Sequence, residues 1–231
     1  MKVAIMYSGG KDSTYAIDFA KEKGWEIAYL LSVKPTRTDC FLYHFATVEM
    51  TKDLAQILGI RHIYTTCNVA DPVQEAEIVK RIVVQNPVDA VILGGTGLQM
   101  TQIRSIQNAL RPYRIEVFAA HSGLEHDDVM QEMLKKGYKF MISQVASYGL
   151  NKEWLGRVLD KNTMDELFER SKVFGFHAGG EGGYYDTLVL DGPIFSKRLD
   201  IEVFQKVMES ENCGHIVVTK SKIVDKIQIR E

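Results

Sequence analysis

Cysteine is scarce in this chain of 231 residues, and the three that occur lie far apart in the sequence. Cys40, Cys67 and Cys213 have neither the spacing of a Cys-x-x-Cys redox pair nor the number that a disulfide framework requires. We therefore expect a reducing, cytoplasmic setting. The histidines show no metal-ligand spacing with these cysteines either, and we assign no zinc. The histidines considered are His121, His126, His177 and His215.

Long hydrophobic runs and a strong charge of one sign are also missing. No stretch approaches the ~20 apolar residues that cross a bilayer. The apolar run 3–6 is followed too soon by glycines and an aspartate for a signal peptide. With a net charge of -2 and no basic stripe interleaved with aromatics, neither membrane binding nor direct nucleic-acid binding is expected.

What the chain does have is the composition of a folded protein, with 45% hydrophobic and 25% charged residues. In the first half, short apolar runs alternate with segments of helical periodicity. This order indicates right-handed crossovers and a doubly wound parallel sheet. The predicted strands are 3–7, 25–33, 60–65, 89–93 and 115–119, and the predicted helices are 13–23, 48–58, 73–85 and 99–110.

After about residue 120 the alternation stops. We predict helices at 127–136 and 162–173 and a strand at 139–145, followed by a glycine-rich acidic stretch, 175–191. A closing hairpin is predicted from strands 215–219 and 223–229 around Lys220-Ser221-Lys222. The change of rhythm predicts a boundary near Ser122, which divides the chain into domains 1–122 and 123–231.

The motif Ser8-Gly9-Gly10-Lys11-Asp12-Ser13 lies between the first predicted strand and the first helix, where parallel sheets bind ligands. The two glycines let backbone N–H groups approach an anion, and the helix dipole favours negative charge there. Lys11 adds a positive charge and the serines add donors. Asp12 would repel bare phosphate, so we predict that it holds Mg²⁺. A glycine turn whose Ser or Asp only caps the helix is the alternative.

This motif resembles the loop of the PP-loop, or N-type, ATP pyrophosphatases, which include GMP synthetase, asparagine synthetase and tRNA-thiolating enzymes. Such enzymes transfer AMP to a carboxyl or carbonyl oxygen and release pyrophosphate, and a nitrogen or sulfur nucleophile then displaces the AMP. The resemblance implies an α/β fold with a doubly wound parallel five-stranded sheet (HUP/PP-loop type, order 3-2-1-4-5). A smaller C-terminal α+β domain for acceptor binding is implied to follow it.

Within that superfamily the whole chain looks most like the diphthine–ammonia ligase branch. Residues 177–187 resemble the Gly-Glu-Gly-Gly-Glu-Tyr/Phe-Glu-Thr signature of that family. Tyr43-His44 is similar to its Tyr/Phe-His segment. The resemblance therefore extends well beyond the nucleotide loop. The other segments that match are 54–60, 145–150, 154–157 and 190–195.

The chain also departs from the pattern of this branch. Tyr184 stands where the signature has its second glutamate, and Asp186 is shorter than the third acidic residue. After the fourth strand the family reads Gly-Ala-Ile-x-Ser-x-Tyr-Gln-Arg-x-Arg, whereas residues 95–105 retain Gln102 but not the arginines. Because the nucleotide loop is intact, these departures concern the acceptor or the ammonia step more than the use of ATP.

The acidic glycine-rich segment is the second candidate site. Glu181 and Asp186 flank Gly182-Gly183, so two carboxylates and two backbone N–H groups could converge on one small ligand. The resemblance implies that this loop faces the ATP loop and binds the acceptor, with Tyr184 and Thr187 contributing. Glu181 is the candidate to orient or deprotonate ammonium. A solvated glycine turn with incidental acids is the alternative.

Three further positions complete the candidate sites. Gly94 and Gly95 end the fourth strand beside the topological switch point, where the backbone can approach ribose or phosphate, or simply turn. His44 could contact phosphate or substrate, or be a hydrogen-bonded core residue. Gln102 is assigned to substrate binding from the family pattern. The catalytic assignments are Lys11, Asp12 and Glu181, and the ATP-binding ones are Ser8, Gly9, Gly10, Lys11, Asp12, Ser13, Gly94 and Gly95.

The leading functional hypothesis is an ATP-dependent amide ligase that forms an acyl-adenylate and amidates it with ammonia. The resemblance implies that the acceptor is diphthine, the modified histidine of elongation factor 2, and that the product is diphthamide. Lys2 rather than a nucleophilic cysteine follows Met1, so free ammonia is the expected nitrogen source. The sequence leaves the oligomeric state open, a homodimer included.

Three alternatives stay open. A relative that activates a different carboxylate or carbonyl substrate is motivated by Tyr184. Sulfur transfer to tRNA is disfavoured, because no paired cysteines are present to carry a persulfide. A non-catalytic ATP-binding protein is disfavoured by the intact Lys11 and Asp12.

Overall fold

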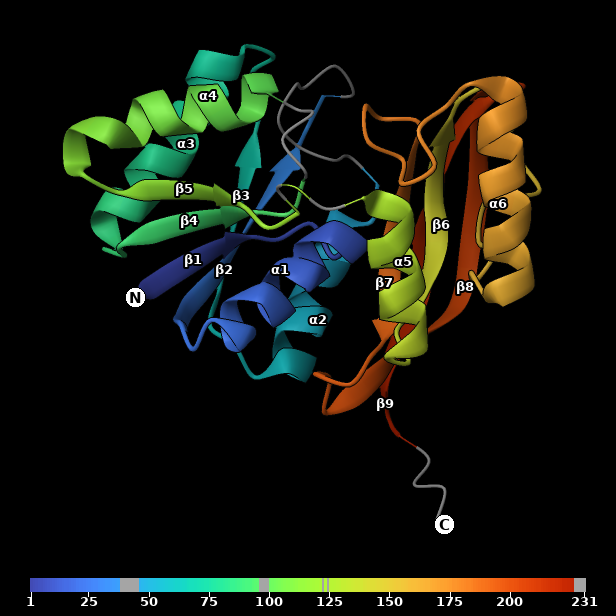
Figure 1. The fold of residues 1–231 in the computed structure, drawn as a ribbon, viewed down its shortest axis with the longest axis horizontal. Helices are drawn as coiled ribbons and strands as arrows, with labels where there is room; N and C mark the ends of the chain where they lie inside the picture. The colour runs from blue at the N-terminus through green and yellow to red at the C-terminus, as the bar shows by residue number, and fades with distance from the viewer. Residues whose placement is uncertain (38–45, 96–99, 122, 124, 227–231) are drawn as a thin grey trace.

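Two sheets and their helices make up the molecule, as seen in a computed structural model (Figure 1). The structure describes residues 1–37, 46–95, 100–121, 123 and 125–226. The first sheet is built from the N-terminal half of the chain and the second from the C-terminal half.

The first sheet has five parallel strands in the order β3-β2-β1-β4-β5, which confirms the predicted fold class and strand order. Each predicted strand and helix of this half is present, with ends that differ by a few residues. The strands are β1 (Lys2–Met6), β2 (Glu26–Pro35), β3 (His62–Cys67), β4 (Ala90–Leu93) and β5 (Glu116–Ala119). The helices are α1 (Lys11–Glu22), α2 (Thr51–Leu58), α3 (Pro72–Gln85) and α4 (Met100–Leu110), with 3₁₀ turns at Val48–Met50 and Arg111–Tyr113.

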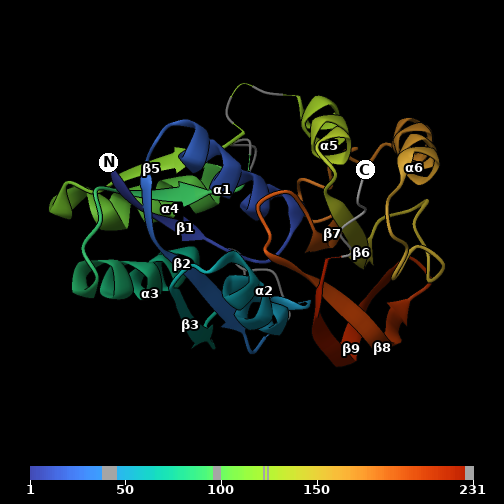
Figure 2. The same ribbon diagram turned by 90° about the horizontal axis from the view of Figure 1, so that it is seen from below.

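Successive side chains of a strand point to opposite faces of the parallel sheet, and both faces contribute to buried cores. In β1, Val3 and Ile5 belong to the core shared with α1 and α2, whereas Ala4 belongs to the core shared with α3. Figure 2 shows α1 and α3 on opposite sides of this sheet. Because both faces are covered, the central strands β1 and β4 are nearly continuous apolar runs, as expected for a parallel sheet.

The N-terminus of α1 differs from those of two other helices. The Asp71 side chain caps α3 and the Asp160 side chain caps α6 (Lys161–Phe174), which are the usual arrangements. At α1 the N-cap residue is Gly10, and no side chain of the motif caps the helix. The reading in which the motif serves only as a helix cap is therefore wrong. The helix begins at Lys11 rather than at the predicted residue 13.

The second sheet is antiparallel, with the order β7-β6-β9-β8. Its strands are β6 (Lys139–Ala146), β7 (Tyr185–Asp191), β8 (Lys197–Ser210) and β9 (Cys213–Asp225), and its helices are α5 (His126–Lys135) and α6. One prediction is wrong here: the hairpin turns at Glu211-Asn212, between β8 and β9, instead of at Lys220-Ser221-Lys222. The strand β7, at the end of the glycine-rich stretch 175–191, was not predicted.

The predicted turn is wrong because a short run of charged and polar residues, Lys220-Ser221-Lys222, is typical of a turn but here lies in the middle of a strand. Lys220 and Lys222 lie within β9, and both pair with Glu202 of β8; the Lys220 contact is 2.7 Å. These cross-strand ion pairs, which stabilise a sheet, let a lysine-rich segment stay extended.

The two halves share one core. The largest buried cluster combines residues of β1, α1 and α2 with residues of α5, β6, α6 and β7. A buried hydrogen bond also joins the halves, since the Tyr138 hydroxyl donates to Asp18 of α1 at 2.6 Å. Within the part of the chain that the structure describes, no helix is long and apolar enough to span a bilayer.

Candidate active site

A cleft lies at the carboxyl ends of β1, β2 and β4, where it meets the turn that precedes β7. Two segments form its polar walls. We call residues 8–13 the pyrophosphate loop and residues 179–187 the acidic loop. Their residues in the lining are Ser8, Gly10, Lys11, Asp12, Ser13, Gly179, Gly180, Glu181, Tyr185, Asp186 and Thr187.

The structure therefore places both predicted loops on the walls of one cleft. The Lys11 backbone N–H donates to Thr187 Oγ1 at 3.0 Å, and the Val189 N–H donates to the Gly9 carbonyl at 2.8 Å. The Lys11 ammonium donates to the Gly179 carbonyl at 2.6 Å. These contacts fix the acidic loop against the first turn of α1.

Lys11 and Asp12 form the charged centre of the cleft. Lys11 Nζ lies 2.8 Å from Asp12 Oδ2, and the side chains are 4% and 30% exposed. Burial raises the pKa of the Asp12 carboxyl, but Lys11, His121 and His126 outweigh it and hold that pKa below its usual range. Asp12 is therefore ionised at neutral pH and available to a cation.

Gly94, the first residue after β4, supports the pyrophosphate loop from behind. A Cβ atom on Gly94 would lie 2.6 Å from the backbone of both Asp12 and Ser13. No side chain fits in that space, so the close approach of β4 to the first turn of α1 requires glycine. Gly95 lines the cleft too, and a Cβ there would lie 3.1 Å from Glu181 Oε1.

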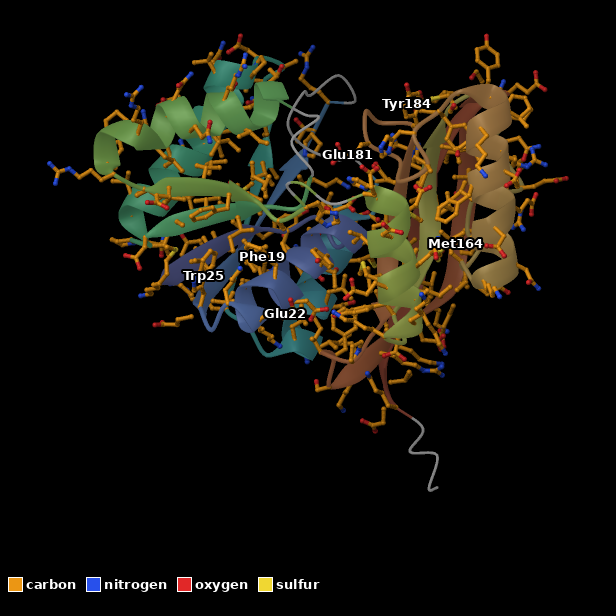
Figure 3. All side chains as sticks on the ribbon, viewed as in Figure 1. Phe19, Glu22, Trp25, Met164, Glu181 and Tyr184 are labelled. Carbon is orange, nitrogen blue, oxygen red and sulfur yellow. The ribbon has the colours of Figure 1, made fainter. Side chains whose placement is uncertain are left out.

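Glu181 is buried at the cleft wall and is only 6% exposed. Its Oε1 lies 3.1 Å from Nε2 of His126, the first residue of α5. Figure 3 shows Glu181 between the two halves of the molecule and Tyr184 further out, over the C-terminal half. A buried carboxylate beside an imidazole can orient or exchange a proton with a small polar ligand.

Two histidines that the sequence left without a role meet at this centre. Asp12 Oδ1 lies 3.8 Å from His121 Nε2 and 3.9 Å from His126 Nδ1. Burial lowers the pKa of His121 to about 4, and burial lowers that of His177 as well. His121 is therefore neutral at pH 7. No sequence motif could reveal this cluster, because Asp12 is distant from both histidines along the chain.

An apolar wall was also missed. Leu31 and Val33 lie on β2, Leu93 ends β4 and Ile106 belongs to α4; with Ala46 and Val48 they line the cleft. The sequence shows these apolar residues at the predicted strand ends, but it could not mark them as cleft residues, because apolar residues at strand ends occur in any buried sheet. An apolar wall beside an anion-binding loop suits a flat aromatic base.

Other predicted site residues lie elsewhere. Gly182 and Gly183 are exposed and do not line the cleft. Tyr184 is half-buried, and its ring centroid lies 6.3 Å from that of Phe176. His44 lies outside the described residues, as does the side chain of Gln102.

Comparison with known proteins gives the family. The model of the diphthamide synthase N-terminal domain matches residues 1–110, and the model of the diphthamide synthase C-terminal domain matches residues 125–224. The chain belongs to the diphthamide synthase family. The pyrophosphate loop falls in the first matched segment, and the acidic loop falls in the second.

Relatives of the diphthamide synthase family match along nearly the whole chain. Proteins named diphthine–ammonia ligase from Homo sapiens and Bos taurus are each 28% identical over 233 residues, which cover 91% of this chain and 86% of the relative. The Danio rerio protein of the same name is 24% identical over 100% of this chain and 99% of its own. These matches confirm the family to which the signature segments pointed.

Proposed function

We propose that this protein is an ATP-dependent carboxylate–ammonia ligase that releases AMP and pyrophosphate, with diphthine on elongation factor 2 as its acceptor. Its family membership supports this activity. The observation that carries the proposal is the convergence of the pyrophosphate loop and the acidic loop on one cleft. This cleft has a cationic, helix-N-terminal wall for phosphates beside an acidic wall for an amine.

The pyrophosphate loop performs the first half of the reaction. A substrate carboxylate oxygen attacks the α-phosphorus of ATP, the bond to the β-phosphate oxygen breaks, and pyrophosphate leaves. The Lys11 ammonium and the N-terminus of α1, whose N-cap residue Gly10 has no side chain, stabilise the charge that develops on the leaving group. Asp12 would hold Mg²⁺, which neutralises phosphate charge when bound. Ser8, Gly9, Gly10 and Ser13 would surround the phosphates, with Gly94 and Gly95 beside them; all of these except Gly9 line the cleft.

The acidic loop performs the second half. Ammonia attacks the acyl carbon of the adenylate, the amide C–N bond forms, and AMP leaves. Glu181 lies at the cleft wall, where it can bind ammonium and accept the proton that must be lost before attack. Asp186 and Thr187 also line this wall. The substrate roles of Gly182, Gly183, Tyr184, His44 and Gln102 stay predictions.

The experiment combines the protein with ATP, Mg²⁺, an ammonium salt and elongation factor 2 that carries diphthine. AMP, pyrophosphate and amidated acceptor are expected in equal amounts. Mixtures without ammonia or with unmodified elongation factor 2 serve as controls. ATP binding without AMP release from any carboxylate tested would contradict an enzyme and favour a non-catalytic ATP-binding protein.

A second candidate acceptor is motivated by Tyr184 and by the missing arginines in 95–105. If AMP forms with ammonia and a different carboxylate but not with diphthine, the enzyme activates another substrate through the same cleft.

We also propose a cytoplasmic location and a domain boundary near residue 122. The oligomeric state, with a homodimer as one option, is open to measurement by light scattering.

A further inference from the structure

Three potential metal ligands converge beside the cleft. Asp12, His121 and His126 each offer one ligand atom, and these atoms all lie within 4.8 Å of one another. They come from three different elements: the first turn of α1, the segment after β5 and the first residue of α5. Lys11 contacts Oδ2 of Asp12, so Oδ1 is the oxygen that faces the two imidazoles.

The imidazoles are buried without hydrogen bonds. His121 is fully buried and His126 is 4% exposed. Among the described residues, none of their four ring nitrogens has an aligned hydrogen-bond partner; His126 Nε2 has a contact of hydrogen-bond length with Glu181 but lacks the alignment. A buried polar atom without a partner is destabilising, because it has lost its hydrogen bonds to water. A cation between Asp12 Oδ1 and the two rings would give each ring a partner.

Glu181 sets the orientation that a ligand would need. A carboxylate beside His126 Nε2 favours the tautomer with a proton on that nitrogen, which leaves the Nδ1 lone pair directed toward Asp12. Histidine ligands in metalloproteins commonly donate their other ring N–H to a carboxylate in this way. A side chain on Gly179 would collide with the His126 ring, since its Cβ would lie 2.4 Å from Nδ1. The acidic loop therefore packs tightly around this histidine.

The donor set selects the class of ion. Mg²⁺ prefers oxygen ligands, whereas imidazole suits divalent transition metals and zinc. Two imidazoles and a carboxylate leave coordination positions open, as catalytic zinc sites do. Bonds of about 2.0–2.2 Å to the metal place neighbouring ligand atoms about 3.0–3.6 Å apart. The Asp12–His121 and Asp12–His126 distances of 3.8 and 3.9 Å exceed this range by a few tenths of an ångström, and the ligand atoms of the two imidazoles lie within 4.8 Å of each other.

We propose that Asp12 Oδ1, His121 Nε2 and His126 Nδ1 form a binding site for a divalent first-row transition metal or Zn²⁺, with Glu181 as the carboxylate that orients His126. The proposal does not depend on the ligase activity, because all three ligands belong to the protein and binding requires no ATP. An ion at this position would link the pyrophosphate loop, the end of the parallel sheet and the start of α5.

The test uses Co²⁺ as the probe on the full chain, freed of metal by dialysis against a chelator. Equilibrium dialysis in a large excess of Mg²⁺, together with the visible absorption of protein-bound Co²⁺, measures binding without ATP. About one bound Co²⁺ per chain is expected. Because imidazole ligands prefer Co²⁺ to Mg²⁺, the excess of Mg²⁺ should not displace it. The ligase activity is tested separately by AMP release, so a protein that binds no Co²⁺ would contradict the metal site but not the proposed function.

Variants assign the ligands. His121→Asn and His126→Asn should each weaken Co²⁺ binding by roughly 100-fold or more, and Glu181→Gln by about 10-fold, as is typical of a residue that orients a ligand. Because the histidines are buried, Asp12→Asn is the milder variant: at a side chain that is 30% exposed, it replaces the anionic ligand with a neutral and weaker one of nearly the same shape. His215→Asn is the matched control, since His215 lies 3.7 Å from Glu209 and forms a histidine–carboxylate pair away from the cluster.

Folding of each variant is checked by circular dichroism, and Co²⁺ binding is compared only among folded variants. Loss of binding in Asp12→Asn and in at least one histidine variant, with His215→Asn unchanged, supports the site. No Co²⁺ binding by the wild type overturns it. So does wild-type affinity in the folded Asp12→Asn variant, or loss of binding in His215→Asn alone.

Discussion

The two walls of the cleft are built in different ways. The pyrophosphate loop is one contiguous stretch whose shape follows from the strand before it, the helix after it and Gly94 behind it. The acidic loop has a regular element, β7, only at its C-terminal end. Its position depends on contacts with the other half of the chain, such as those of Thr187 and Gly179 with Lys11. Local sequence thus defines the first wall, while tertiary packing places the second.

The largest effect is expected from the charged centre of the first wall. Lys11→Ala and Asp12→Ala should lower the rate of AMP release by ~10²–10³, the usual loss when a group that stabilises developing charge is removed. Lys21→Ala, an exposed position on the same helix, is the control. Retention of more than a tenth of the wild-type rate in either variant would refute the assignment.

Gly94→Ala tests how rigidly the first wall is held. The added Cβ would meet backbone at 2.6 Å, so the loop must shift, and a shift of about 1 Å can cost roughly 10²-fold in rate. We expect a large loss in kcat/KM for ATP in steady-state assays. Gly24→Ala is the control: its φ of +66° strains an alanine, which should lower stability, but a Cβ there meets nothing within 4 Å and Gly24 does not line the cleft, so the kinetics should not change. Equal kinetics for Gly94→Ala and wild type would mean that the pyrophosphate loop tolerates displacement.

Tyr138→Phe tests the packing between the halves. It removes the donor to the buried Asp18 carboxylate and should lower the free energy of unfolding by about 1–3 kcal/mol at neutral pH. Burial raises the pKa of Asp18, so the stability that this group contributes is lost as pH rises through that pKa, where the charge must be buried.

The destabilisation by Tyr138→Phe should therefore shrink on acidification, when Asp18 is protonated in both proteins. Urea denaturation at neutral and acidic pH measures this difference. Tyr148→Phe, at a side chain that is 78% exposed, should be neutral at both. A destabilisation that is independent of pH would assign the effect to packing alone.

The smallest effect is expected at Tyr184, on the rim of the second wall. Its ring packs beside Phe176 rather than in the cleft lining, so Tyr184→Glu should change ammonia-dependent AMP release by less than about threefold. The assay uses diphthine-bearing elongation factor 2 over a range of ammonium concentrations. A clear gain in ammonia-dependent turnover would instead place residue 184 in the ammonia or acceptor site, where the family signature has a glutamate.

The hydrophobic pattern of the sequence was sufficient to predict the elements of the parallel sheet. Every strand and helix of the first half was predictable, because residues buried on both faces form apolar runs separated by glycine-marked turns. The antiparallel half was less predictable. Its strands β8 and β9 are only partly buried, and ion pairs between charged residues in mid-strand accompany the extended conformation.

The sequence by itself determined the fold class, the glycine-rich strand–turn–helix motif of residues 8–13 and the family signature in 177–187. Only the tertiary structure decided that Glu181 faces the cleft while Tyr184 does not, and that His121 and His126 meet Asp12. The physical reason is the range of the interactions involved. Backbone conformation and helix polarity are encoded within a few residues, whereas a cluster of side chains depends on how distant elements pack.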